Sequence, residues 1–452
     1  MELQVVFPKE KPKYIAIYEQ LKEKIIQQQL IANEKLPSKR KLAEQLNISI
    51  QTVQIAYEQL LSEGYIYSVE RSGYFIAEYS RDWKSVNFTK SPSIETVNDK
   101  PEFNLKNGQV DAEAFPFKVW QKLYRNQLQT YPVQNSTWQG EKSLRNEITH
   151  YIQNARGINC QPEQIFIFSG TQQQLQALCI FFGTIAVAME EPGFHRANAI
   201  FQQMKFNVEY VPIDKYGATI PTKRGKLYYV TPAHQFPLGS VMTVERKIQL
   251  LQWAEEADAY IIEDDYDAEF RYKGLPIPPL AHMDQLQRVI YFGTFSKTLI
   301  PSIRMSYIIL PMPLAKQFKA FYQQQKSTVS KIDQLVTAEF MAAGYYTRHI
   351  EKMRTLYRKK RKVLLDALQT NLTDEFKILG DTAGLHIIIQ LPQWLNEKRA
   401  VQLALEKGIA IDPVSTCYQT IPPQHMVMIG FGAIPMQNLH VAIQTLAKSW
   451  LQ

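Results

Sequence analysis

The fold of this chain is decided at residues 294–304, TFSKTLIPSIR. The apolar run at residues 289–292 just before it predicts a buried strand whose end delivers the amine of Lys297 into a pocket. A lysine that is desolvated beside another cation loses its proton readily and becomes a nucleophile. Arg304 supplies a guanidinium that can clamp a phosphate. A lysine taken alone would indicate only a charged surface position, so the neighbours are what favour a functional role.

A second apolar run ends in two carboxylates and a phenol, at Asp264, Asp265 and Tyr266. Together with Lys297 and Arg304, these side chains fit pyridoxal 5'-phosphate (PLP). Lys297 would hold the aldehyde as a Schiff base, Asp264 would pair with the protonated pyridine nitrogen, and Tyr266 would reach the 3'-oxygen. The alternatives for the two aspartates are a metal pair or a solvated strand end. A metal is disfavoured because no third ligand lies nearby in the sequence.

The turn around Gly170 follows an apolar strand and opens a helix. Backbone N–H groups and the positive end of the helix dipole would meet an anion there, although the same turn is equally compatible with a purely structural role. The hydroxyl groups of Thr294 and Ser296 and the guanidinium of Arg304 are further groups that could bind the same anion. We predict a phosphate-binding cup formed by Gly170, Thr171, Gln172, Thr294, Ser296 and Arg304.

Two further loops are expected beside the cofactor ring. A strand-to-helix turn at residues 191–196 presents Phe194, which can stack on the ring, and Arg196, which can bind a carboxylate of an effector. A core phenylalanine and a surface arginine are the plain alternative there. The Pro- and Gly-rich loop at residues 231–239 presents His234 or Gln235. Loops at the carboxyl ends of strands are where such sheets bind ligands.

Residues 1–79 predict a separate winged helix-turn-helix module. Apolar side chains keep helical spacing from Tyr14 to Ile26, and again in a short helix that follows Pro37. A third helix, at about residues 51–63, is expected to bury Val53, Ala56, Leu60 and Leu61. Two aromatic strands around residues 71–73 would form the wing. We therefore predict an α+β domain whose third helix reads DNA.

Acidic and basic residues balance over this module, so its attraction for DNA must come from the placement of cations. Lys35, Lys39, Arg40 and Lys41 supply a local positive field, and Gln51, Thr52 and Gln54 remain on the outer side of the third helix. The predicted DNA contacts are Pro37, Ser38, Lys39, Arg40, Ser49, Gln51, Thr52, Arg71, Ser72 and Gly73.

Residues 80–101 lose apolar periodicity and gain polar residues and proline, which is typical of a linker. From residue 102 to residue 452, apolar strands alternate with helical stretches, which predicts a mostly parallel α/β sheet between helices. The expected strands are residues 165–168, 185–189, 227–230, 260–263, 289–292 and 306–310. A long polar helix at about residues 331–368 would open a smaller α/β subdomain, about residues 331–452, with strands near 384–391 and 427–430. The basic run at residues 358–362 indicates a solvated helix face or, as a second option, an auxiliary DNA contact.

Composition bounds the class of protein. A chain of 452 residues suggests about three domains, and a net charge of +8 favours a polyanionic partner. Cys160, Cys179 and Cys417 are isolated, which argues against zinc and disulfides and indicates a reducing compartment. No signal peptide is apparent, and no apolar run reaches the roughly 18 residues that a membrane helix needs. We expect a soluble, cytoplasmic protein.

The order and spacing of these motifs resemble the MocR/GabR-type bacterial transcription regulators across almost the whole chain. That family joins a GntR-like winged helix to a fold-type I aminotransferase-like domain. The resemblance rests on Leu36-Pro37-Ser38, Leu42-Ala43, Thr52-Val53, Glu63-Gly64-Tyr65, Ser72-Gly73-Tyr74-Phe75, Ser169-Gly170-Thr171-Gln172, Glu191-Pro192-Gly193, Thr231-Pro232, His234-Gln235, Glu263-Asp264-Asp265-Tyr266, Ser296-Lys297 and Gly430-Phe431-Gly432. It implies the PLP roles given above, Arg196 as an effector contact, and a homodimer with cofactor sites at the subunit interface.

Three positions depart from the family's pattern. Ile50 replaces an arginine that commonly follows the serine of the recognition helix, and Phe194 replaces a tyrosine. Arg399 is the only arginine between Gly384 and Gly432, and residues 427–430 are apolar where an arginine is frequent. Aminotransferases usually clamp the substrate carboxylate from this region, so ordinary transamination is disfavoured.

Three functions remain open at this point. The leading hypothesis is a PLP-dependent transcription regulator whose effector, an amine or amino acid, acts at Lys297 and reorients the DNA-binding modules. A rival is a genuine aminotransferase with an autoregulatory DNA-binding domain, and a vestigial half-reaction is compatible with either. In a third hypothesis PLP itself is the signal. The DNA-binding module favours regulation, and the missing arginine disfavours turnover.

Overall fold

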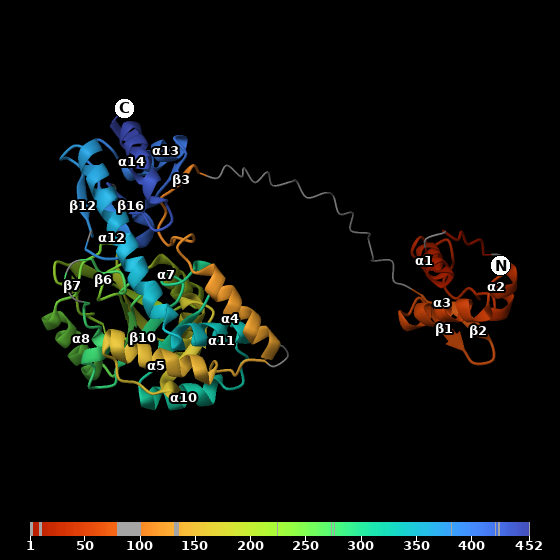
Figure 1. Cartoon of the computed structure of the whole chain (residues 1–452). Coiled ribbons are helices and arrows are strands. Elements are labelled where there is room, and N and C mark those ends of the chain that lie inside the picture. Colours follow the sequence, from red (N-terminus) through yellow and green to blue (C-terminus); the bar gives the residue numbers. More distant parts are fainter. Residues whose placement is uncertain are drawn as a thin grey trace. The chain divides into compact units, whose positions relative to one another are not determined.

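The computed structural model describes residues 3–8, 11–78, 101–130, 135–223, 225–272, 274, 276–380, 382–420, 422–423 and 425–451. The chain divides into two compact units, Met1–Val97 and Asn98–Gln452 (Figure 1). The predicted linker lies outside the described residues, except for residue 101 at its end. No described helix is both long and apolar enough to cross a membrane.

The N-terminal unit, which we call the head, is the predicted winged helix-turn-helix. Its elements are α1 (Lys13–Ile26), α2 (Lys39–Leu46), α3 (Ile50–Ser62), β1 (Ile66–Val69) and β2 (Gly73–Ile76). Asn47 ends α2 in the left-handed conformation that a tight helix-turn-helix corner requires, with φ of 50°. The two strands pair antiparallel, with Val69 opposite Gly73 at the tip of the wing.

The core of the head differs in detail from the periodic pattern. Val53, Ala56 and Leu60 are buried as predicted, but Leu61 is exposed and Tyr57 is buried in its place. The hydroxyl of Tyr57 donates a hydrogen bond of 3.0 Å to the carbonyl oxygen of Pro37, so its polar end is satisfied inside the core. The two ends of the predicted apolar stripe on α1, Tyr14 and Ile26, are exposed.

The C-terminal unit contains the predicted large, mostly parallel sheet. Its eight strands lie in the order β4-β11-β10-β9-β8-β5-β6-β7, and β4, β11 and β7 run antiparallel to their neighbours. Their bounds are β4 (Ile165–Phe168), β5 (Ala186–Glu191), β6 (Asn207–Asp214), β7 (Gly217–Ala218), β8 (Leu227–Val230), β9 (Tyr260–Asp264), β10 (Val289–Thr294) and β11 (Ser306–Ile309). Strands β6 and β7 at one edge were not predicted.

Helices cover both faces of this sheet, because alternate side chains of the central strands point in opposite directions. Ile290 and Phe292 of β10 pack in the cluster that includes side chains of α6, α7 and α10, whereas Tyr291 packs in the cluster that includes α4, α5 and α11. The helices are α4 (Phe117–Thr130), α5 (Lys142–Arg156), α6 (Thr171–Phe182), α7 (His195–Gln203), α8 (Val244–Glu256), α9 (Leu280–Met283), α10 (Met312–Tyr322) and α11 (Lys331–Ala342).

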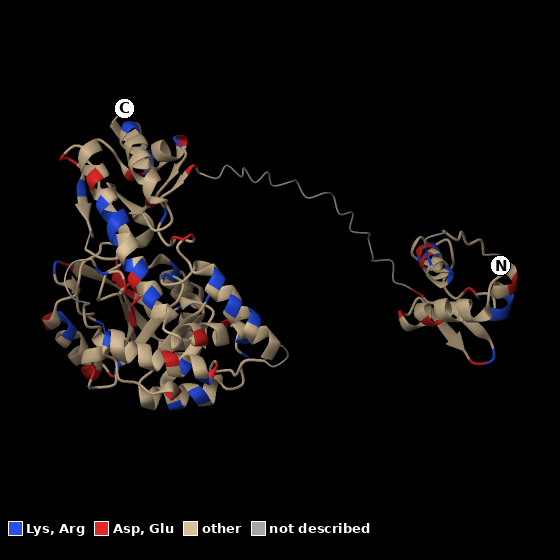
Figure 2. Ribbon diagram, viewed as in Figure 1, with Lys and Arg blue, Asp and Glu red and all other residues tan. Residues whose placement is uncertain are grey.

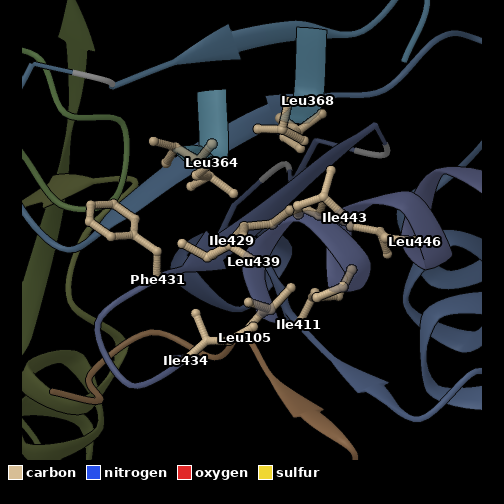
Figure 3. Close-up of a cluster of buried hydrophobic side chains, with 14 of the residues drawn as sticks. Leu105, Leu364, Leu368, Ile411, Ile429, Phe431, Ile434, Leu439, Ile443 and Leu446 are labelled. Atoms are coloured by element: carbon tan, nitrogen blue, oxygen red, sulfur yellow. The ribbon is translucent and has the colours of Figure 1, made fainter. Parts of the chain in front are cut away.

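A smaller subdomain is built on a second sheet with its own apolar core. The antiparallel order is β12-β13-β16-β15, and β14 pairs in parallel with β3 from the start of the unit. The elements are β3 (Phe103–Asn104), α12 (Tyr345–Asn371), β12 (Lys377–Leu379), β13 (His386–Gln390), α13 (Glu397–Glu406), β14 (Ile409–Ala410), β15 (Asp412–Pro413), β16 (Met426–Gly430) and α14 (Met436–Leu451). Figure 3 shows leucines of α12 and α14 meeting Ile429 and Leu105 in this core.

Two predictions about this region are wrong. The long polar helix is interrupted, because Gly344 adopts φ of 70° between α11 and α12. Helix α11 packs against α4 and α5 in the large part, so the small subdomain begins within α12 and not at residue 331.

The basic run at residues 358–362 is not wholly solvated, as a solvated helix face would be. Lys360 is buried and forms an ion pair of 2.7 Å with Asp111.

Candidate functional site

The site lies where the parallel strands end, at one edge of the large sheet. In the register of the sheet, Asp264 at the end of β9 is opposite Phe292 of β10, and Val230 at the end of β8 is opposite Glu263. The loops that follow β8, β9 and β10 carry His234, Tyr266 and Lys297. The parallel register therefore brings three separately predicted motifs to the same edge.

Lys297 lies in the loop that follows β10. A Cβ on Gly108 would lie 3.7 Å from Nζ, so this glycine is directly beside the amine. Burial, helped by the charge of Arg196 and opposed by Asp267 and Asp264, lowers the pKa of Lys297 to about 8. The lysine is thus poised to supply a neutral amine near physiological pH.

Asp264 is fully enclosed and accepts a short hydrogen bond from the hydroxyl of Tyr229. Burial raises the pKa of Asp264 to about 7, and the bond from Tyr229 works against this rise. The carboxylate therefore lacks a full counter-charge, and a protonated pyridine nitrogen placed beside it would supply one. The neighbouring Asp265 is committed elsewhere, since it forms a buried ion pair of 2.5 Å with Arg156.

The predicted phosphate cup has a glycine at its base. Gly170 adopts φ of 105°, and a Cβ there would lie 2.6 Å from Nη2 of Arg304. The guanidinium is held over the turn by a hydrogen bond of 3.3 Å from Nη2 to the carbonyl oxygen of Ser169. In the described part of the chain, the amides of Thr171 and Gln172 at the start of α6 have no acceptor. These groups fit a phosphate at a helix N-terminus.

Two hydroxyl groups near the predicted phosphate cup, those of Thr294 and Ser306, accept hydrogen bonds from backbone amides of the surrounding turns. The Oγ1 of Thr294 accepts a hydrogen bond of 3.1 Å from the amide of Ser296, so that hydroxyl also shapes the loop that leads to Lys297. Ser306 at the start of β11 was not predicted, yet its hydroxyl accepts a bond of 3.0 Å from the amide of Gly170. That bond holds the turn on which the predicted phosphate cup is built.

Buried His234 and Asp267 and partly buried Tyr266 form the side of the site that would face the 3'-oxygen. Nδ1 of His234 lies 3.0 Å from Oδ2 of Asp267 and 3.0 Å from the hydroxyl of Tyr266. The carboxylate favours a proton on Nδ1, which leaves the hydroxyl hydrogen of Tyr266 free to donate toward a cofactor oxygen. Burial raises the pKa of Tyr266 well above its usual range, so this donor stays protonated.

Phe194 and Arg196 lie at the start of α7, on a turn that is attached to the small subdomain. The carboxylate of Glu191 accepts hydrogen bonds from the amides of Gln419 and Thr420, at 2.5 and 2.7 Å, and from the Thr420 hydroxyl at 2.7 Å. Arg196 is exposed, and its charge lowers the pKa of Lys297 together with burial. The position of the predicted effector contact is therefore coupled to that of the small subdomain.

Sequence reasoning missed several partners in this site. Tyr229 precedes its carboxylate partner by 35 positions, Asp267 follows His234 by 33, and Arg156 precedes Asp265 by 109. The pairing of β8 with β9 brings Tyr229 to Asp264, and the packing of α5 and of the loops after these strands brings the other two pairs together. The two tyrosines of β8 and the acidic residues after β9 are the sequence features that could have suggested these contacts. Neither feature indicates which residue is the partner.

The head presents most of the predicted DNA contacts on its surface. Lys39 and Arg40 are on α2, and Gln51 is exposed on the first turn of α3. Ser49 caps α3, since its Oγ accepts from the amide of Thr52 at 3.2 Å and lies 2.7 Å from that residue's hydroxyl. Ser38 caps α2 in the same way, through the amide of Lys41. Arg71, Ser72 and Gly73 form the tip of the wing.

Pro37 is the exception among these predicted contacts. Its side chain is buried, and its carbonyl oxygen accepts the hydrogen bond from Tyr57 in the core of the head. A buried proline cannot reach a phosphate or a base edge. Its position just before Ser38 sets the start of α2, away from the surface that the other predicted contacts share.

Comparisons with known proteins agree with both units. Residues 13–76 match the family described as bacterial regulatory proteins of the gntR family, and residues 101–446 match aminotransferases of class I and II. The chain is 41% identical to the HTH-type transcriptional regulator YdeL of Bacillus subtilis, over 97% of each chain. It is 32% identical to the probable rhizopine catabolism regulatory protein MocR of Rhizobium meliloti, over 97% of this chain and 94% of that protein.

A third relative and two solved structures complete the comparison. The pyridoxine biosynthesis regulator PdxR of Corynebacterium glutamicum is 30% identical, over 92% of this chain and 91% of its own. An archaeal alanine:glyoxylate aminotransferase and the kynurenine aminotransferase of Pyrococcus horikoshii are each 25% identical and cover 77% of this chain and 90% of their own, with TM-scores of 0.71 and 0.70. The chain therefore belongs to the MocR/GabR-type transcription regulators, which join a gntR-family winged helix to a PLP-binding aminotransferase-like domain.

Proposed function

We propose that this regulator binds operator DNA through the head and changes its DNA affinity when a small molecule engages the PLP at Lys297. The observation that carries the proposal is a partly buried lysine whose pKa is lowered to about 8 and is affected by the charges of Asp264 and Arg196, in the same chain as a winged helix. When bound, PLP supplies an aldehyde that reacts with amines. The effector is accordingly an amine, an amino acid or PLP itself.

The small subdomain has features that favour binding of an effector over catalytic transamination. Strands β13 and β16 face the site region without any lysine or arginine, and the missing cation is not supplied by Arg399. That arginine lies on α13, where its side chain is 53% exposed and 3.9 Å from Glu406. His386 is opposite Gly430 in the sheet, and burial lowers the pKa of His386 to about 4, so it is neutral. A substrate carboxylate would find no cationic clamp on these two strands.

Arg196 is then the residue that recognises a carboxylate on the effector. It lies on the turn attached through Glu191 to residues 419–420 of the small subdomain. An effector bound at Arg196 would therefore favour one position of that subdomain. Movement of the subdomain is how effector binding at the PLP site can be transmitted to the rest of the protein. A cytoplasmic location and a homodimer, with one head for each of two operator half-sites, complete the proposal.

A titration separates the possible signals. PLP-free protein is titrated with PLP while binding to an operator duplex is followed, and the PLP-loaded protein is then titrated with a panel of amines and amino acids. A response to PLP alone identifies PLP as the signal. A response only to a further amine, accompanied by a change in the visible spectrum, identifies an effector. Conversion of an amino acid to its oxo acid over many turnovers would instead establish an aminotransferase.

A further inference from the structure

The outward side of the first turns of the recognition helix carries isoleucine and glutamine, ahead of the exposed Glu58. Ile50 and Ile55 of α3 are 48% and 42% exposed, so much of their apolar surface is open to a partner. Gln51 and Gln54 lie between them at spacings that put all four on one side of the helix, opposite Val53 and the rest of the buried face. Helix α3 is the second helix of the helix-turn-helix, the element that enters the major groove.

This face has no positive charge. The sequence of α3, IQTVQIAYEQLLS, contains neither lysine nor arginine, and Figure 2 shows the helix without blue. The amide of Gln54 donates to Glu58 at 2.8 Å, whereas that of Gln51 makes no hydrogen bond to any residue that the structure describes. The bidentate arginine or lysine contact to guanine, the commonest specific contact in the major groove, is therefore unavailable to α3.

Exposed cations of the head lie instead on α2 and beside the rings of the wing. Lys39 and Arg40 are on α2, and the side chain of Arg40 is 82% exposed. The ammonium groups of Lys35 and Lys39 lie over the rings of Phe75 and Tyr74 on the wing, at 6.0 and 5.8 Å from the ring centres. These cations suit the phosphates on either side of a groove, and they leave reading of the base edges to the uncharged side chains Ile50, Gln51 and Ile55 of α3.

We propose that α3 reads A·T base pairs through thymine methyl groups and adenine edges, an inference that rests on the proposed DNA-binding function. In the major groove, the C5-methyl of thymine is the apolar group on a base edge, and an exposed isoleucine gains by covering it. A glutamine amide is matched to N6 and N7 of adenine. Ile50 and Ile55 are thus the thymine contacts, and Gln51 is the adenine contact.

The test begins by finding what the protein binds. Full-length, PLP-loaded protein selects from a random-sequence duplex library at fixed salt, and each thymine of the enriched core is then replaced singly by deoxyuridine, which removes only the methyl group. Wild type is compared with Ile50→Ala and Ile55→Ala. The matched control is Ile31→Ala, which truncates an isoleucine that is 71% exposed but lies outside α3. Circular dichroism and binding to unselected duplex confirm that each variant is folded.

We expect the enriched core to be A·T-rich, and loss of one contacted methyl to weaken wild-type binding about fourfold. That penalty should disappear in Ile50→Ala or Ile55→Ala and persist in Ile31→Ala. A core of G·C pairs, a wild-type affinity indifferent to every uracil, or a penalty unchanged in both α3 variants would overturn the inference while leaving operator binding intact. Equal affinity for all duplexes, with no sequence enriched, would overturn the proposed function and this inference with it.

Discussion

Replacing Gly170 with alanine should weaken PLP binding by displacing Arg304. The added Cβ would lie 2.6 Å from Nη2 and 3.1 Å from Cζ of that side chain, and the guanidinium is the flexible partner that must move. A charge-assisted hydrogen bond contributes about 1.5–3 kcal/mol, so losing the arginine's contact with the phosphate corresponds to a loss in affinity of roughly 10- to 150-fold. The backbone cost is separate, about 1–3 kcal/mol for a side chain at φ of 105°.

Gly183 at the other end of α6 provides the matched control. It also has positive φ, 71°, with ψ of −165°, but a Cβ there meets nothing within 4 Å. Gly183→Ala should therefore lower the thermal stability of the PLP-free protein about as much as Gly170→Ala does, and leave PLP affinity near that of wild type. Affinity is measured by equilibrium titration of the PLP-free proteins, followed by visible absorbance. If both variants bind PLP equally well, or if both lose affinity equally, the phosphate position assigned to Arg304 is wrong.

Three further predictions concern the lysine and the head. Lys297→Ala should lose the visible absorbance of covalently held PLP while keeping its far-ultraviolet circular dichroism, and absorbance retained after borohydride treatment and digestion would contradict this. The rate at which PLP-free protein binds PLP covalently should rise with pH and level off above pH 8, because the lowered pKa of Lys297 is about 8 and only the neutral amine attacks. Stopped-flow rates that do not change from acid to alkaline pH would refute this prediction. Lys39→Ala and Arg40→Ala should each reduce the salt slope of operator binding by about 0.9, whereas an unchanged slope in a filter-binding or anisotropy titration would exclude a phosphate contact.

The sequence predicted elements well where a single pattern dominates. Strands at residues 165–168 and 227–230 match β4 and β8, because short apolar runs bounded by turns have few alternatives in an α/β chain. Lys297, Asp264 and His234 were expected in one place, because parallel strands end at the same edge. Their being close together follows from topology, and topology could be inferred from the alternation of strands and helices.

What the sequence did not predict depends on long-range pairing. Arg156 forms an ion pair with Asp265, and Tyr229 forms a hydrogen bond with Asp264. The sequence shows an arginine and a tyrosine but does not indicate which aspartate each of them contacts. The pairing of β3 with β14 brings the start of the domain into the small subdomain, although each strand has only two residues. Gly344 was visible in the sequence, but a glycine inside a periodic helix pattern does not by itself indicate a break.

The central claim is that the chemistry at Lys297 controls the head. Its most direct test is an anisotropy titration of one selected duplex with wild type and Lys297→Ala, in the presence and absence of PLP and of any amine that changes the wild-type visible spectrum. If the chemistry at Lys297 controls the head, PLP or the amine shifts the Kd of wild type for the duplex and leaves that of Lys297→Ala unchanged. A wild-type Kd that stays constant while the spectrum changes, or an equal shift in both proteins, would contradict it.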